Sequence, residues 1–246
     1  MHRSLRIESS IGQSFQPFSP AHGVTVVVCA AFIASLLVVA GRARQKKQEQ
    51  TLRRSFAWFA LAWQVFATIW WLLPAPFDLA ISLPLQLCDL VGVIGPIALL
   101  TQNRRLRSLL YFWGLGFSTE AFITPILADG PATVHFWLFW GGHTLIVAGA
   151  LYDLIIRRYR PTTRDYLFVT LVGVAYVAVI ATFDLVFKLN YGYLGDSLPD
   201  ARTALDVLGP YPWRIGSIFL VGQTILTLLW IVWLRPKRDK YSPLDQ

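Results

Sequence analysis

Charged residues are scarce in this chain, at 15% of its 246 residues, whereas hydrophobic residues reach 55% and include ten Trp. This balance excludes an ordinary soluble domain and indicates a polytopic membrane protein. Cysteine is scarce too, and two cysteines exclude a disulfide framework. A single bridge between Cys29 and Cys88 stays geometrically open, although we interpret Cys29, whose neighbours are all apolar, as a small packing residue.

Seven stretches are long and apolar enough to cross a membrane as helices, which takes about 20 residues each. We therefore expect an all-α bundle of seven transmembrane helices at 22–234, between an N-terminal segment at 1–21 and a tail at 235–246. The expected spans are 22–41, 55–73, 80–100, 107–127, 133–156, 166–188 and 213–234.

Lys and Arg are distributed very unevenly between the connections. Seventeen of the 22 follow the first, third, fifth and seventh spans, and the other five lie on the opposite side. The positive-inside rule then predicts a multi-pass protein of the cell membrane with its N-terminus outside and its C-terminus in the cytoplasm. The formal charge of +8 is thus mainly a topology signal with a secondary attraction to anionic lipid headgroups, and it gives little support to a nucleic-acid partner.

Polar groups inside the expected spans gather at one depth. With a rise of about 1.5 Å per residue, Cys88 and Asp89 lie roughly 12 Å below the outer end of their span, and His143 lies about 15 Å below the end of its own. Such groups are costly in hydrocarbon, which makes them candidates for function. The same outer half holds Glu120, Asp184 and Arg214, and Gln223 lies deeper.

Cys88 shares a helix face with Gly92 and Gly95, two residues that let a neighbouring helix approach closely, so we expect it to face protein. Asp89 points about 100° away and is interpreted as a structural or His-orienting group. A thiol and an imidazole in apolar surroundings are the minimum for acyl transfer through a thioester. Because Cys88 and His143 are 55 residues apart, their spacing alone does not pair them.

Six sequence blocks carry a resemblance to a known family: LPLQLC at 83–88, YFWGL at 111–115, AFITP at 121–125, HTLIV at 143–147, NYGYL at 190–194 and LGPYPW at 208–213. In this order they resemble the signatures of the YwaF-like bacterial integral membrane proteins. That family is similar to a human seven-span ether-phospholipid acyltransferase with a proposed Cys nucleophile and His base.

The resemblance implies that Cys88 is the nucleophile and His143 the base, acting on a membrane phospholipid or lysophospholipid without a cofactor or a metal. Asn190 and Tyr191, in the fifth block, are implied as supporting or substrate-binding residues. Transfer of the acyl group to a lipid and its hydrolysis by water both stay open.

Two positions depart from the family pattern. Gln86 stands where members often have His, and an amide cannot act as a base. Arg214 stands where members often have Tyr, and it either binds a lipid phosphate at the outer interface or pairs with Asp184 or Asp206.

A metal-dependent membrane hydrolase is one alternative, since a catalytic zinc needs three protein ligands. The candidate ligands are His22, His135 and His143 with Glu120 or Asp89.

A transporter, an ion pathway or a seven-span receptor is the other alternative, because acids within helices can form proton relays. A retinal pigment is disfavoured, since 213–234 has no Lys to form a Schiff base. A cavity closed toward the cytoplasm would favour an enzyme, whereas a polar path to Arg104 or Arg157 would favour transport.

Overall fold

The structure is a computed structural model, and it describes residues 15–75, 77–127, 129–196 and 207–234. In these ranges the chain forms helices and no β-strand, which confirms the all-α class. Most of the expected N-terminal segment and all of the expected tail, at 1–14 and 235–246, lie outside the described residues. The main helices are α1 (Pro20–Gln45), α2 (Glu49–Leu72), α3 (Leu87–Thr101), α4 (Arg104–Gly116), α5 (Val134–Leu151), α6 (Thr163–Phe187) and α7 (Trp213–Ile231).

Five of these helices are long and apolar enough to cross a membrane: α1, α2, α6, α7, and α5 with the π-helical turn Tyr152–Ile156 that continues it. Side chains at the N-cap positions fix where two of these helices begin. Ser19 accepts a hydrogen bond from the first turn of α1, and Thr162 begins α6 in a capping box. Several apolar helices of this length confirm a multi-pass membrane protein.

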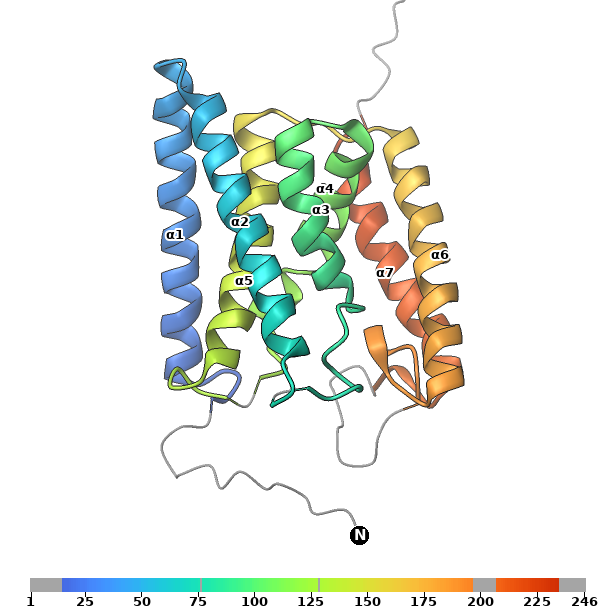
Figure 1. Cartoon of the computed structure of the whole chain (residues 1–246). Helices are drawn as coiled ribbons and strands as arrows, with labels where there is room; N and C mark the ends of the chain where they lie inside the picture. The colour runs from blue at the N-terminus through green and yellow to red at the C-terminus, as the bar shows by residue number, and fades with distance from the viewer. Residues whose placement is uncertain (1–14, 76, 128, 197–206, 235–246) are drawn as a thin grey trace, which may run out of the picture.

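Helices α3 and α4 form a short hairpin that reaches only part-way along the bundle (Figure 1). Their 15 and 13 residues extend about 22 Å and 20 Å, against about 30 Å of hydrocarbon in a bilayer. The expected spans 80–100 and 107–127 are therefore not confirmed as continuous helices. Each is a short helix joined to a non-helical stretch.

Proline explains why the two expected spans are shortened. Pro84 disfavours helical backbone at the residue before it, and α3 begins only at Leu87. Helix α4 ends at Gly116, and Pro125 and Pro131 follow before α5 starts. Hydropathy counts the apolar residues of these stretches as α-helix, although the only helical backbone described in them is the 3₁₀ turn Glu120–Phe122.

Non-helical backbone inside a membrane protein must find hydrogen-bond partners within the protein. The Tyr191 hydroxyl donates to the Leu79 carbonyl at 2.7 Å and accepts from the Leu83 amide at 3.0 Å. The Tyr176 hydroxyl donates to the Leu85 carbonyl at 2.9 Å. Two phenols from the far half of the chain thus hold the segment that leads into α3.

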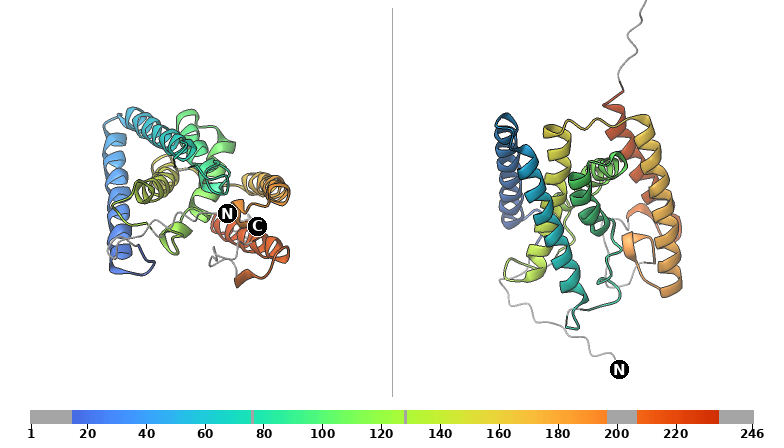
Figure 2. Two further views of the ribbon diagram at one scale, coloured as in Figure 1. Left: turned by 60° about the horizontal axis from the view of Figure 1, so that its bottom comes forward. Right: turned by 45° about the horizontal axis from the view of Figure 1, so that its top comes forward.

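The hairpin packs among the longer helices, with α4 more deeply buried than α3. It packs on α2 and α5 through α3, and on α5, α6 and α7 through α4, while α1 packs on the outside of α2 and α5. A view along the bundle shows α1 and α6 on opposite sides of the molecule (Figure 2).

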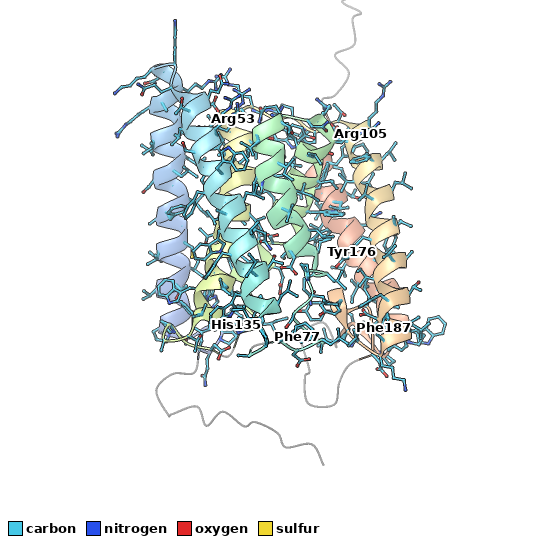
Figure 3. All side chains as sticks on the ribbon, in the orientation of Figure 1. Arg53, Phe77, Arg105, His135, Tyr176 and Phe187 are labelled. Carbon is cyan, nitrogen blue, oxygen red and sulfur yellow. The ribbon has the colours of Figure 1, made fainter. Side chains whose placement is uncertain are left out.

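The two ends of the bundle differ in charge. Arg53 and Arg105 lie at one end, whereas Phe77, His135 and Phe187 lie at the other (Figure 3). We call the first the basic end. It contains ion pairs of Arg53 with Glu49 (3.3 Å), Arg157 with Glu49 (3.2 Å), Arg107 with Asp153 (2.9 Å) and Arg104 with Asp165 (2.5 Å).

Candidate active site

Cys88 lies in the first turn of α3, not in the middle of a long helix. Gln86 is the N-cap, and its backbone amide donates to the Asp89 carboxylate at 3.2 Å. Asp89 therefore caps the helix, in line with the structural role expected for it. The Cys88 sulfur lies 3.7 Å from the Ser118 hydroxyl oxygen, just beyond the end of α4. The candidate nucleophile and this hydroxyl thus lie together where α3 begins and α4 ends.

His143 lies in the middle of α5 and has one ring nitrogen engaged. Its Nδ1 is 2.7 Å from the Phe139 carbonyl oxygen, which can only accept, so Nδ1 carries a proton. In the neutral ring, Nε2 then has the free lone pair that a base needs. The ring packs against Phe139 with centroids 4.5 Å apart, and it interacts electrostatically with Asp89 and Glu120.

A cavity of about 610 Å³ joins these groups. This is the size range of small-molecule sites, and its walls are mostly apolar with a few polar groups, as such sites usually are. Helices α2 to α7 all contribute to its walls. Six of the ten predicted catalytic or supporting residues line it: Gln86, Cys88, Asp89, Glu120, His143 and Gln223. His135, considered as a metal ligand, lines it as well.

Four other predicted supporting residues do not line this cavity: Asp184, Asn190, Tyr191 and Arg214. Asp184 accepts from the Tyr191 amide at 2.9 Å, and Asn190 accepts from the Gly195 amide at 3.1 Å. They hold the turn after α6, and through the Tyr191 hydroxyl that turn holds the segment before α3. These contacts are of the supporting kind considered for them.

Arg214 lies in the first turn of α7. The side chain is buried, with 3% of its surface exposed, and it donates to the Gly195 carbonyl at 2.6 Å. A guanidinium buried in this way is not presented to lipid headgroups at a membrane surface. The contact ties α7 to the turn after α6, and Asp206, one of the two acids expected to pair with Arg214, lies outside the described residues.

The sequence also matches a known protein family. The model of the TMEM164 family, a family of membrane proteins, matches residues 17–234. The chain belongs to the TMEM164 family. No curated protein and no solved structure matches it.

Three residues of this TMEM164 family member near the thiol were missed in the sequence. Ser118 was hidden because the helix was expected to continue past it, although the Ser-Thr pair before Glu120 is a polar signal. Gln64, from α2, lines the cavity together with Asp89. Tyr193 lines the cavity, and burial raises the pKa of its phenol, with the charges of Glu120 and Cys88 adding to the shift.

The imidazoles considered as metal ligands are spread over the TMEM164-family structure. His22 is hydrogen-bonded to the Phe18 amide and the Phe122 carbonyl, and His135 lies 2.6 Å from the Asp129 carboxylate. Among the described residues, no three His, Cys, Asp or Glu side chains come together to hold a metal ion. The metal-dependent alternative therefore has no ligand set within the described ranges.

The cavity does not extend to the basic end. Its lining contains neither Arg104 nor Arg157, the two residues that would mark a polar path. Buried apolar side chains, among them Leu99 and Leu110, pack between α3, α4 and α5 on that side. Cys29 and Cys88 are both free thiols, so no disulfide ties α1 to α3. The described residues thus close the cavity toward the basic end.

Proposed function

We propose that the protein is a membrane lipid acyltransferase or acyl-ester hydrolase that works through Cys88 and His143. The observation that carries this proposal is the shared cavity, lined by both residues, with His143 Nδ1 engaged by a carbonyl and Nε2 left as the base. Resemblance of the sequence to YwaF-like proteins, and through them to an ether-phospholipid acyltransferase, adds support. The substrate class is a membrane phospholipid or lysophospholipid.

The reaction proceeds in two balanced steps. The Cys88 thiol gives its proton to His143 Nε2, and the sulfur attacks the ester carbonyl carbon of the lipid. As the carbon–oxygen bond breaks, the leaving alcohol takes the proton from the imidazolium, and a thioester remains. In the second step an acceptor hydroxyl, from a lysolipid or from water, gives its proton to His143 and attacks the thioester, releasing the Cys88 thiolate, which takes the proton back.

The first turn of α3 supplies the charge stabilisation that acyl transfer needs. The first-turn amides of a helix have no intrahelical acceptor, so those of Leu87 and Cys88 are free of the helical ladder. Such amides, together with the helix dipole, stabilise an oxyanion. A nucleophile on this turn is therefore next to donors for its own tetrahedral intermediate.

We also propose seven crossings of the cell membrane, with the N-terminus outside and the basic end in the cytoplasm. Five crossings are the long helices, and the other two are α3 and α4 together with the non-helical stretches that extend them. The excess of Lys and Arg at the connections of the basic end supports this orientation. The cavity then opens in the outer half of the bilayer.

The two cysteines give a matched test. Purified protein is incubated with a phospholipid and a lysophospholipid, and acyl transfer and free fatty acid are measured together with covalent labelling by an electrophilic lipid probe. Cys88→Ala and His143→Gln should lose activity by at least about 100-fold, the scale of a lost nucleophile or base. Cys29→Ala should retain it. Unchanged activity and labelling in Cys88→Ala, with intact thermal unfolding, would reject the proposal.

A further inference from the structure

The cavity continues beyond Cys88 into a space between three helices, which we call the apolar arm. Its walls come from the end of α4, one face of α6 and one face of α7. They are formed by Trp113, Gly173, Val177, Ile218, Gly222 and Leu226. None of the described residues in these walls is charged.

The arm belongs to the same cavity as the thiol. Tyr176, which lines the cavity together with Cys88, donates from its hydroxyl to the Leu85 carbonyl, three residues before the thiol. The Thr170 hydroxyl lies 3.4 Å from the Gln223 side-chain oxygen, and both residues line the cavity. Gly116, which also lines the cavity, packs directly on α7.

We infer that the apolar arm holds the acyl chain of the lipid substrate and that Gly173 sets how long a chain it accepts. The inference rests on the proposed function, because it assumes that the ester carbonyl lies at Cys88. An uncharged arm in the same cavity as the nucleophile matches a hydrocarbon chain attached to that carbonyl. A headgroup would find no charged partner in it.

Gly173 determines the usable space because of what surrounds it. A Cβ atom built at Gly173 would meet nothing within 4 Å. Thr170 and Val177, one turn to either side, share its helix face and also line the cavity. A larger side chain at Gly173 therefore extends into the arm without displacing packed neighbours. Gly216 on α7 has equally open surroundings but does not line the cavity.

The test uses N-alkyl iodoacetamides with ethyl, octyl and hexadecyl chains, which alkylate Cys88 with loss of iodide. The protein is held in phospholipid nanodiscs, and the rate at the Cys88 peptide is followed by mass spectrometry. In the wild type the long-chain probes should react faster than the ethyl probe. In Gly173→Phe this preference should fall about tenfold, because losing room for two methylenes is worth about that factor. Gly216→Phe should keep the wild-type preference.

Each outcome bears on a different claim. Equal chain-length preferences in Gly173→Phe and Gly216→Phe would overturn the inference. If Gly173→Phe reacts with the ethyl probe at the wild-type rate, the variant is folded around Cys88. If it does not, the smaller substitution Gly173→Val is tested in its place. If lipid acyl transfer survives Cys88→Ala while the chain-length preference depends on Gly173, the proposed function fails and the arm remains a binding site for alkyl chains.

Discussion

Tyr191→Phe should destabilise the protein strongly, although it removes only one oxygen atom. Tyr191 is fully buried, with 0% of its surface exposed, and its hydroxyl bonds both the Leu79 carbonyl and the Leu83 amide. Phenylalanine keeps the ring and its packing but leaves both backbone groups without this partner. Because these groups belong to the non-helical segment before α3, no helical hydrogen bond replaces them.

The magnitude follows from the two bonds. A typical hydrogen bond contributes about 0.5–1.5 kcal/mol net, and a buried group left unpaired costs about 1–3 kcal/mol. Leu79 is partly exposed, so its carbonyl can find another donor, and the total should be about 2 kcal/mol. For a chain of this length that corresponds to a fall in Tm of roughly 4–8 °C.

Tyr193→Phe is the matched control, since it makes the same change in the same 3₁₀ turn (Tyr191–Tyr193). The Tyr193 hydroxyl makes no hydrogen bond to a described residue, so its loss should shift the free energy of unfolding by less than about 0.5 kcal/mol. Both variants are measured by thermal unfolding in the same detergent. Equal shifts for the two, or no shift for Tyr191→Phe, would show that the phenol does not hold the segment before α3.

Two further predictions concern helix packing and the basic end. Gly141→Ala should destabilise by about 1–3 kcal/mol, because its Cβ would overlap the rigid Trp63 indole. Gly142→Ala, with nothing within 4 Å of its Cβ, should leave stability unchanged or raise it by up to about 1 kcal/mol through helix propensity. If thermal unfolding shows Gly142→Ala to be the less stable of the two variants, the described contact between Gly141 and Trp63 is wrong. Arg107→Met should cost about 3–5 kcal/mol, since it leaves the buried Asp153 carboxylate without its ion pair. The double variant Arg107→Met with Asp153→Leu should recover most of the lost free energy of unfolding, measured in denaturant. If the effects of the two single substitutions simply add, the two residues do not stabilise the protein as an ion pair.

Much of the fold is predictable from the sequence, because a long helix in a membrane depends on local features. Apolar runs of about 20 residues predicted the five long helices. The limits of α3 and α4 depend instead on contacts from distant parts of the chain. Nothing near Leu79 or Leu83 indicates that a tyrosine more than 100 residues later will satisfy their backbone. Hydropathy therefore extended both helices through segments that are apolar but not helical.

The sequence predicted part of the candidate site. It placed Cys88 and His143 together, but for a different reason from the one that the structure gives. Equal depth along two continuous helices suggested that Cys88 and His143 lie together, whereas both line one cavity because α3 starts beside it. Arg214 shows the limit of the argument from composition. An arginine at the start of a span is compatible with an exposed phosphate contact or with a buried structural one, and its burial against Gly195 depends on how the turn after α6 folds.

The short hairpin accounts for several features of the site at once. Two helices that stop part-way among longer ones leave a space that their missing turns would have filled, and the cavity occupies it. The same geometry puts Cys88 on a first turn, where free amides stabilise negative charge, and puts Ser118 beside its sulfur. Continuous helices over 80–100 and 107–127 would have buried the thiol among side chains and paired those amides. The departure from the expected seven long helices is therefore what makes acyl-transfer chemistry at Cys88 physically reasonable.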